Sequence, residues 1–505
     1  MAVPPLLFLV RTFFPGSSFY PGTWGFGLVG PADEADTEEL IDTICAVGAD
    51  IPDKQLVRSF VSGITPAIQR LKSLGCIPKK ASQNGEREFI PCFDHKHRNW
   101  NGLEAHSLKE CFTNRIAQNQ ITVLEECTLL DIVKDSERVI GIVVANKGRL
   151  ELLGCSSLIL ATGGYGDLFK YHLCPSDVNG SFHCLALKAG CQLTNMEFMQ
   201  MMLGFLSPAC NTIFNEKTYR FAHFQTSDGR ELFDDKDSFF LDLRAMHGPF
   251  TSRLPSKIVD QKIHKEFLKS GHGIIVSYNR RDNLPEFVNI YFEWLKATKG
   301  VSVDDSIEAA IFAHAANGGI KIDCEGWTGV PGLFACGEVT GGMHGADRIG
   351  GLSTANGLVF GQRSGIAAAA FALRMRQSEH ESIEYDYRPR IFKDTSNIKH
   401  HIQNAMYENA LVFRNEEGLK RTIEEFSTYQ NSGKCDDYAN FEDIVMSRSV
   451  ECQLTTALCI LKSALLRTES RGSHFREDYP GTNSRLAFPI CVRLEGERIV
   501  AYFTE

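Results

Sequence analysis

The sequence lacks the cysteine spacings that metal and iron–sulfur sites use, although it contains 16 cysteines. No two of them form a CxxC pair, and no spacing of the kind that zinc or iron–sulfur sites use is repeated. This pattern indicates reduced thiols in an intracellular protein and predicts neither a metal site nor a cluster of its own. His95 and His97 of DHKHRNW have no further ligands nearby in the sequence, so we interpret them as part of a solvated loop.

Dense positive charge and long apolar runs are also missing. Lys and Arg number 53 against 62 Asp and Glu, and no basic cluster is dense enough to follow a phosphate backbone. No segment approaches the ~20 apolar residues of a membrane span. The N-terminal LLFLV has no basic residues before it and no small-residue cleavage site after it, so we expect a buried strand there. We therefore expect a cytoplasmic protein with no nucleic-acid partner and no membrane span.

The apolar patterns of the chain indicate an α/β core. ITVLEECTLLDIV, RVIGIVVAN and SSLILATGG read as strands, and the last of them runs into a glycine turn. Residues 53–75 repeat an apolar residue at about 3.6-residue spacing and end at Gly75, which predicts a helix. With 505 residues, the chain is long enough for two or three domains.

Two glycine-rich turns have the geometry of a cofactor site. SLILATGGYGD is a strand that ends at Gly163 and Gly164, where the backbone can approach a ligand closely. In GLFACGEVTGGMHGADRIGGLS, a strand delivers Glu338, a loop poor in side chains follows, and a helix begins near Ser353. The amides at a helix start favour a negatively charged group, so this loop suits a large planar or phosphorylated cofactor.

Taken in order, these segments resemble the flavoprotein family of fumarate reductase, succinate dehydrogenase and L-aspartate oxidase. That family carries GE, HGANRLGGNSL and VFGR in succession. The matching segments here extend over essentially the whole chain and include ATGGYGD, NMEFMQ, HAANGGIKID, GADRIGGLS and RTESRGSHFREDYP.

The resemblance implies a Rossmann-like FAD-binding domain, truncated at its N-terminus, with an inserted α+β capping domain and a C-terminal helical domain. The expected bounds are 1–204 and 306–378 for the FAD-binding domain, 205–305 for the capping domain and 379–505 for the helical domain. The implied cofactor is FAD, held without a covalent bond because SSFYPGTWGFG has no histidine.

The resemblance also implies roles for individual residues. His314 and Arg348 match residues that grip a substrate carboxylate, and a guanidinium offers a bidentate clamp for such a group. The positions expected to hold FAD or to lie near it are Ser17, Ser18, Thr23, Gly25, Gly163, Gly164, Glu338 and Ser353. Arg471, His474 and Arg476 near the C-terminus have two interpretations, a functional one and a structural corner that docks the helical domain, and the second is favoured.

The sequence departs from the family at several places. The first strand, GxGxxG turn and helix that hold the FAD pyrophosphate are absent, and Val10 stands where a ribose-binding acid is expected. The substrate-binding His-Pro-Thr is replaced by residues 202–204, Met-Leu-Gly. Ser256 takes the place of the proton-donating arginine, which leaves Lys257 or Arg253 as substitutes.

These observations favour an FAD-dependent oxidoreductase that transfers hydride between flavin N5 and a small carboxylate-bearing substrate. Electrons would come from an electron-transfer protein, a diffusible donor or the substrate itself. A completing subunit could supply the missing pyrophosphate wall. Two alternatives stay open: a non-catalytic paralogue or partner subunit that has lost FAD, and a truncated product of an active enzyme.

Overall fold

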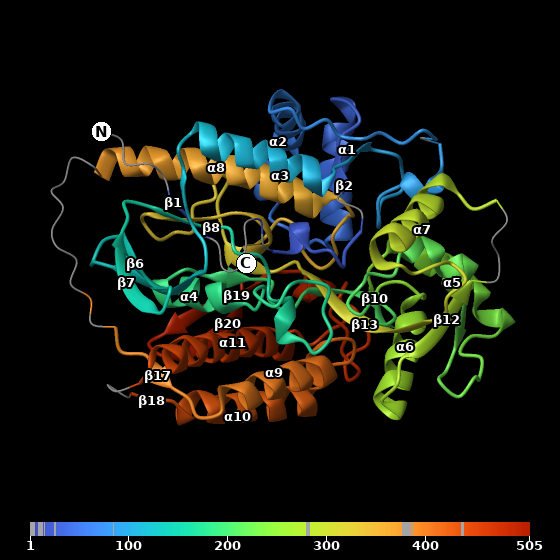
Figure 1. Cartoon of the computed structure of the whole chain (residues 1–505). Helices are drawn as coiled ribbons and strands as arrows, with labels where there is room; N and C mark the ends of the chain where they lie inside the picture. Colours follow the sequence, from blue (N-terminus) through green and yellow to red (C-terminus); the bar gives the residue numbers. More distant parts are fainter. Residues whose placement is uncertain are drawn as a thin grey trace.

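The fold is a layered α/β body with a second lobe on one side and a helical layer beneath (Figure 1). The computed structural model describes residues 6–8, 14, 16–24, 27–83, 85–278, 283–375, 385, 387–435 and 439–504. The expected α/β fold is confirmed, since helices and strands are mixed along the chain.

Two short pairs of parallel strands lie at the centre of the FAD-binding region. β1 (Leu6–Phe8) pairs with β4 (Thr122–Leu124), and β8 (Leu158–Leu160) pairs with β15 (Leu333–Ala335). The structure does not join the two pairs into one sheet within the described residues. Two helices, α3 (Ala105–Gln118) and α8 (Leu352–Met375), lie on the same side of these strands in Figure 1.

The helix expected at 53–75 is confirmed as α2 (Lys54–Ser73). The carboxylate of Asp53 accepts hydrogen bonds from the backbone N–H groups of Gln55 and Leu56, which caps the first turn. The apolar face of α2, from Leu56 to Leu71, is buried against α1 (Ala35–Val47) and α8. Gly75 follows with a φ of 91°, a conformation that costs glycine little.

The remaining strands and helices around the centre complete this part of the molecule. They are β2 (Gly27–Gly30), β3 (Asn99–Gly102), β5 (Cys127–Lys134), β6 (Val139–Asn146), β7 (Arg149–Gly154), α4 (Ser181–Ala189), β9 (Leu193–Thr194), β14 (Gly319–Lys321) and β16 (Thr340–Gly341). A five-stranded sheet in the order β16-β14-β9-β19-β20 includes the C-terminal hairpin β19 (Ile490–Glu495) and β20 (Arg498–Phe503). The end of the chain therefore returns to the FAD-binding region.

The second lobe is built on a four-stranded antiparallel sheet. Its order is β10 (Met199–Ser207), β13 (Ile307–Ala316), β12 (Ile274–Tyr278) and β11 (Ala222–Gln225). Three helices belong to this lobe, α5 (Ser238–His247), α6 (Lys257–Ser270) and α7 (Glu286–Lys299). β10 and β13 lead into and out of the lobe, so it is an insertion in the FAD-binding region.

The C-terminal part is a layer of three helices, α9 (Thr395–Ala410), α10 (Glu416–Ser432) and α11 (Phe441–Leu466), with the short strands β17 (Arg390–Ile391) and β18 (Lys434–Cys435). Among the described residues, α11 is the one helix long and apolar enough to cross a membrane, and 78% of its apolar window is buried inside the protein. α11 packs against α4, α9 and α10 and so resembles the core helix of a globular protein.

A buried ion pair holds the second lobe together. Asp260 of α6 accepts hydrogen bonds from Nε and Nη2 of Arg244 of α5, at 2.7 and 2.9 Å, and both side chains are 0% exposed. No other acidic side chain forms an ion pair with Arg244 among the described residues. The bidentate geometry offsets the desolvation of the two charges.

Replacing Asp260 with Asn should therefore destabilise the protein by ~3 kcal/mol or more, because it leaves a buried guanidinium without a counter-charge. The measurement is the free energy of unfolding in urea. Glu266→Gln on the same helix is the matched control, since its partner Arg230 is 56% exposed and the pair should contribute less than ~1 kcal/mol. Equal effects from the two substitutions would contradict this assignment.

Candidate active site

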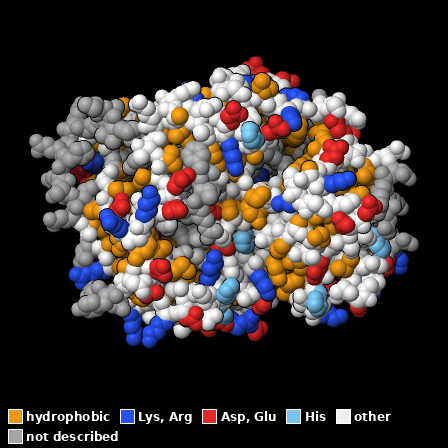
Figure 2. All heavy atoms as spheres, viewed as in Figure 1, with side chains coloured by type: hydrophobic (Ala, Val, Ile, Leu, Met, Phe, Trp, Pro, Cys, Tyr) orange, Lys and Arg blue, Asp and Glu red, His pale blue; other side chains and the backbone are white. Residues whose placement is uncertain are grey.

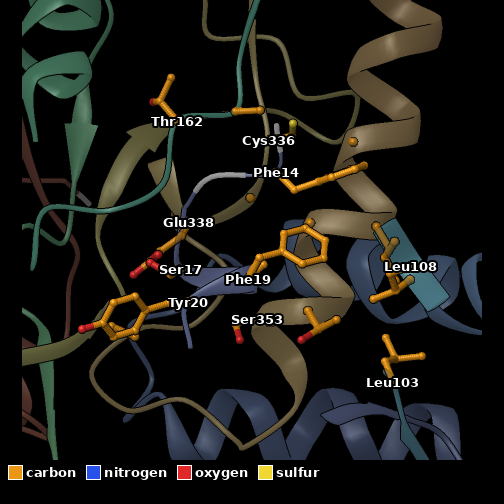
Figure 3. A pocket seen from close by; sticks show the side chains of 18 of the residues that line it. Phe14, Ser17, Phe19, Tyr20, Leu103, Leu108, Thr162, Cys336, Glu338 and Ser353 are labelled. Carbon is orange, nitrogen blue, oxygen red and sulfur yellow. The ribbon is translucent and has the colours of Figure 1, made fainter. Parts of the chain in front are cut away.

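A cavity of about 4070 Å³ lies between the FAD-binding region and the second lobe. This volume is several times that of an ordinary small-molecule pocket, ~300–1,000 Å³. The cavity is bounded by α3, by β8, by the start of α8 and by the loop after Glu338, with β10 and β13 at the side of the second lobe. Figure 3 shows part of this wall, with Ser17, Tyr20, Glu338 and Ser353 around the opening.

The two glycine turns meet at Glu338. The backbone N–H of Ala316 donates a hydrogen bond to Glu338 Oε1 at 2.9 Å, and Ser17 points toward the same carboxylate in Figure 3. A Cβ on Gly164 would lie 2.7 Å from Glu338 Oε1, so a side chain there would displace the carboxylate. Burial raises the pKa of Glu338, and the hydrogen bond from Ala316 opposes this effect. The close approach explains why glycine is needed at position 164.

The N-terminus of α8 opens onto the cavity directly after the glycine-rich loop. Ser353 and Thr354 lie in its first turn and line the cavity, as do Gly350 and Gly351. Gly351 has a φ of 81°, and a Cβ there would lie 2.6 Å from a side-chain atom of Val29. The first turn of a 24-residue helix thus presents unpaired amides and its positive end to whatever occupies the cavity.

Arg348 and His314 bring polar groups to the same cavity. Arg348 is 7% exposed, its Nε has no hydrogen-bond partner, and no acidic side chain forms an ion pair with it among the described residues. His314 Nδ1 is also buried without a partner. Burial, assisted by the nearby Arg348, lowers the pKa of His314 to about 3, so the imidazole is neutral at neutral pH. Together they form a cationic wall with a neutral hydrogen-bonding group beside it.

The preceding residue, Asp347, has hydrogen-bond partners on its side chain, unlike Nε of Arg348. Asp347 Oδ2 accepts hydrogen bonds from Thr251 Oγ1 at 2.8 Å and from Arg253 Nε at 3.1 Å. Arg253 also donates to the carbonyl oxygens of Ala46 and Val47 at the end of α1. This network ties the second lobe to the FAD-binding region, and Arg253 is committed to it.

Lys257 lies outside the cavity wall. Its Nζ donates a hydrogen bond to the carbonyl oxygen of Ser252 at 3.2 Å and lies over the ring of Phe475. Neither Lys257 nor Arg253 is among the residues that line the cavity. The structure therefore does not bring either proposed substitute for the proton donor to the site.

The other residues expected near FAD are partly accounted for. Ser17, Ser18 and Thr23 line the cavity, and Thr23 Oγ1 donates to the carbonyl oxygen of Tyr20 at 3.1 Å. Gly163 has a φ of 75°, as a strand-to-loop turn needs. Gly25 and Val10 lie outside the described residues.

The stretch at 25–30, GFGLVG, has GxGxxG spacing, but its described residues Gly27–Gly30 form strand β2 and not a turn before a helix.

Arg471, His474 and Arg476 occupy a buried corner away from this wall. Arg471 pairs with Glu469 and donates to the carbonyl oxygen of Ala49, while Arg476 pairs with Asp478. His474 contacts Arg414, and none of the three residues lines the cavity. These contacts support the structural interpretation of the C-terminal motif.

Sequence reasoning missed three cavity residues, Cys92, Glu216 and Lys217. Cys92 Sγ donates a hydrogen bond to Glu216 Oε1 at 2.9 Å, and Lys217 Nζ donates to the carbonyl oxygen of Ile90 at 3.2 Å. Cys92 stands 124 residues before Glu216, which is followed directly by Lys217, and neither segment has a distinctive motif. Only the fold brings them together.

Comparisons with known proteins agree with this geometry. The FAD binding domain family matches residues 15–214 and 224–354, and the fumarate reductase flavoprotein C-terminal family matches residues 399–487. The fumarate reductase (CoM/CoB) of Methanothermobacter marburgensis contains a polypeptide that is 27% identical over 90% of this chain and 86% of its own length. L-aspartate oxidase from Yersinia pestis is 25% identical over 92% of this chain and 90% of its own length.

A solved structure of Mycobacterium smegmatis Sdh1 shares the fold with a TM-score of 0.78 and 20% identity, covering 99% of this chain and 89% of that one. The fold and site thus define an FAD-dependent oxidoreductase. The chain belongs to the flavoprotein family of fumarate reductase, succinate dehydrogenase and L-aspartate oxidase.

The buried carboxyl of Asp347 predicts a measurable pH dependence. Burial raises the pKa of Asp347 to about 7, against the opposing effect of Arg253. A carboxyl whose pKa is higher in the folded protein holds its proton there while the unfolded chain has lost it, so its contribution to stability falls as the pH rises from about 4 to about 7.

Replacing Asp347 with Asn should remove this contribution. The stability of the variant relative to wild type should then rise by at most ~1.4 kcal/mol per pH unit between pH 5 and pH 7. Urea unfolding at several pH values measures it. A difference between the two proteins that stays constant over this range would show that Asp347 is ionised throughout.

Proposed function

We propose that the cavity binds FAD without a covalent bond and transfers hydride between flavin N5 and a small carboxylate-bearing substrate. The single observation that supports this most is the unpaired, buried Arg348 guanidinium, which lies in the same cavity as the cofactor loop. A buried cation without a counter-ion is costly unless a ligand provides one. A substrate carboxylate would provide it.

The residues on one side of the cavity fit FAD. Gly163 and Gly164 bring backbone close to Glu338, whose carboxylate can accept hydrogen bonds from cofactor hydroxyls. Ser17 and the first turn of α8 at Ser353 add a hydroxyl and helix amides. When bound, FAD supplies the two-electron chemistry at N5, and the protein supplies position and charge.

Arg348 and His314 are the residues we assign to the substrate. The guanidinium would hold a carboxylate in a bidentate manner and keep the substrate in a fixed orientation. His314, neutral in the free protein, would donate or accept a hydrogen bond, and a bound anion would raise its pKa. Lys257 is left out of this proposal, because its ammonium lies against Ser252 and Phe475.

We further propose that a completing polypeptide segment occupies the groove between α3 and α8. β1 and β8 each have one neighbour within the described strands, so each has one edge that could pair with a further strand. On α8, Gly357, Gly361 and Gly365 line the cavity four residues apart, and a Cβ on any of them would meet nothing within 4 Å. Such glycines let another helix approach closely.

The chemistry of the groove suits a strand followed by a helix. Ile159 is 38% exposed and Leu373 is 64% exposed, and both line the cavity, so apolar surface is available for burial. A strand between β1 and β8 would also satisfy their free backbone edges. An electron-transfer protein is a separate proposed partner, because the described residues contain no group of three side chains able to hold a metal.

On the face shown in Figure 2, Lys and Arg side chains are interspersed with Asp and Glu, which suits neither nucleic acid nor an anionic surface. We propose a cytoplasmic location for the protein.

Replacing Arg348 with Met should lower kcat/KM for the physiological substrate by ~10²-fold or more, because a charge-assisted bidentate contact is lost. Flavin content should stay close to that of wild type. Steady-state kinetics and the flavin absorbance of the purified proteins provide the two measurements, with exposed Arg421→Met as the control. A wild-type protein that is colourless and cannot be reconstituted with FAD would instead favour the non-catalytic alternative.

Replacing Gly361 with Leu separates an empty groove from an occupied one. If the groove holds only solvent, the substitution should raise the stability of α8 by up to ~1 kcal/mol, since leucine is the better helix former, and should leave FAD retention unchanged. If a completing segment packs there, the leucine side chain should displace it and lower the FAD retained through purification. Gly481→Leu, at a glycine without a positive φ and in open space outside the cavity wall, controls for a general effect of replacing glycine.

Flavin attachment can be checked on the same preparations. After denaturation and filtration, a non-covalent cofactor should pass into the filtrate. Flavin that stays with the polypeptide would contradict the non-covalent assignment.

A further inference from the structure

Lys217 is a buried cation in the cavity wall on the side of the second lobe. It is 4% exposed, it lines the cavity, and its Nζ donates one hydrogen bond, to the carbonyl oxygen of Ile90 at 3.2 Å. An ammonium carries three donors, so this contact leaves two of them without a protein acceptor. Among the described residues Lys217 has no ion pair with an acidic side chain.

The acidic side chains near this position are already engaged. Glu216 accepts the hydrogen bond from the Cys92 thiol at 2.9 Å. Glu88, two residues before Ile90, pairs with Arg220 at 3.0 Å. Neither of these carboxylates forms an ion pair with the buried Lys217 ammonium. Burying a charge without a counter-ion is costly.

The backbone holds Lys217 in place. The side chain of Asn215 accepts a hydrogen bond from the N–H of Lys217 at 2.8 Å and caps the short helical turn Glu216–Phe221. With the backbone pinned at one end and Nζ held at Ile90 at the other, the side chain has little freedom left. A cation fixed in this way loses little further entropy when it binds a ligand.

Lys217 and Arg348 both lie near Cys92, whose thiol donates a hydrogen bond to Glu216, the residue before Lys217. The carbonyl oxygen of Cys92 accepts a hydrogen bond from Gly350, two residues after Arg348, at 3.1 Å. Burial of the thiol and the Glu216 carboxylate raise the pKa of Cys92, whereas Lys217 and Arg348 both act to lower it. Both cations are therefore close enough to act on one thiol, and neither has an acidic partner.

The cavity wall near Lys217 differs in sequence from that of the family. Residues 202–204 are Met-Leu-Gly where the family carries a substrate-binding His-Pro-Thr, and Met202 is 4% exposed and lines the cavity. That part of the wall has lost its hydrogen-bond donors. Lys217, on the next segment of the second lobe, restores a donor and adds a positive charge.

We propose that Lys217 binds a second anionic group of the substrate, so that the cavity takes a small molecule with one acidic group at Arg348 and another at Lys217. This inference rests on the proposed function, because it concerns the substrate of the same cavity. Lys217 is then the residue that selects a dianion over a monoanion of the same length.

Fumarate and crotonate are a matched pair of probes, since each has four carbons and a double bond, and a methyl group in crotonate replaces one carboxylate. Binding of each acid is measured by calorimetry on the purified wild-type protein and on Lys217→Met, Lys217→Gln and Lys217→Arg. We expect Lys217→Met and Lys217→Gln to weaken fumarate by ~10–100-fold, the loss of one charge-assisted contact, and to change crotonate by less than ~3-fold. Lys217→Arg should keep most of the fumarate affinity.

Lys269→Met, at an exposed position in the last turn of α6, is the matched control and should change neither affinity. Thermal unfolding of each variant shows whether it folds. If Lys217→Met does not fold, the binding test is made with Lys217→Gln.

Equal losses for both acids, or no loss for fumarate, would overturn the role of Lys217 while leaving the proposed function intact. A wild-type protein that binds the two acids with equal affinity would do the same. If the wild-type protein binds neither acid, both the inference and the assignment of Arg348 to a carboxylate are wrong.

Discussion

The arrangement of opposite charges at two consecutive residues determines how the site works. Asp347 points into a network with Thr251 and Arg253 that joins the second lobe to the FAD-binding region, while Arg348 lines the cavity and forms no ion pair with a described acidic side chain. Because the two side chains leave the backbone in different directions, the anchoring of one fixes the position of the other. The position of the buried Arg348 guanidinium is thus fixed by the hydrogen bonds of Asp347, the preceding residue.

The FAD-binding region also has a groove, between α3 and α8, that the described residues leave open. The parallel pairs β1–β4 and β8–β15 share no hydrogen bonds, and the glycines of α8 face the space between α3 and α8. Ile159 and Leu373 leave apolar surface exposed in this groove. The glycine turns around Glu338 form one wall of the cavity, and the groove between α3 and α8 is where we propose that a further polypeptide segment binds.

The sequence predicted the parts of the structure that rest on local patterns. The helix over 53–75 followed from apolar spacing, the turn at 163–164 followed from a strand that ends in glycines, and the helix start near Ser353 followed from the glycine-rich loop before it. The family resemblance correctly indicated FAD and the oxidoreductase class. These features are local, or are carried by ordered motifs, and so they can be read from one chain.

The parts that could not be predicted depend on contacts between distant segments. Lys257 stands next to the expected position in the sequence, but the start of α6 directs its side chain to Ser252 and Phe475. Cys92 and Lys217 looked ordinary in the sequence, and only the packing of the second lobe on the 90–94 loop gives them a place in the cavity.

Cys92 packs closely against two glycines. A Cβ on Gly248 would lie 2.6 Å from the sulfur, and a Cβ on Gly350 would lie 3.1 Å from the backbone nitrogen of the same residue. The two glycines come from the second lobe and from the loop after Arg348, so one small side chain acts as a spacer between them. A bulkier side chain at position 92 would therefore push the second lobe away from the loop after Arg348, so the distance between these two parts depends here on the volume of a single thiol.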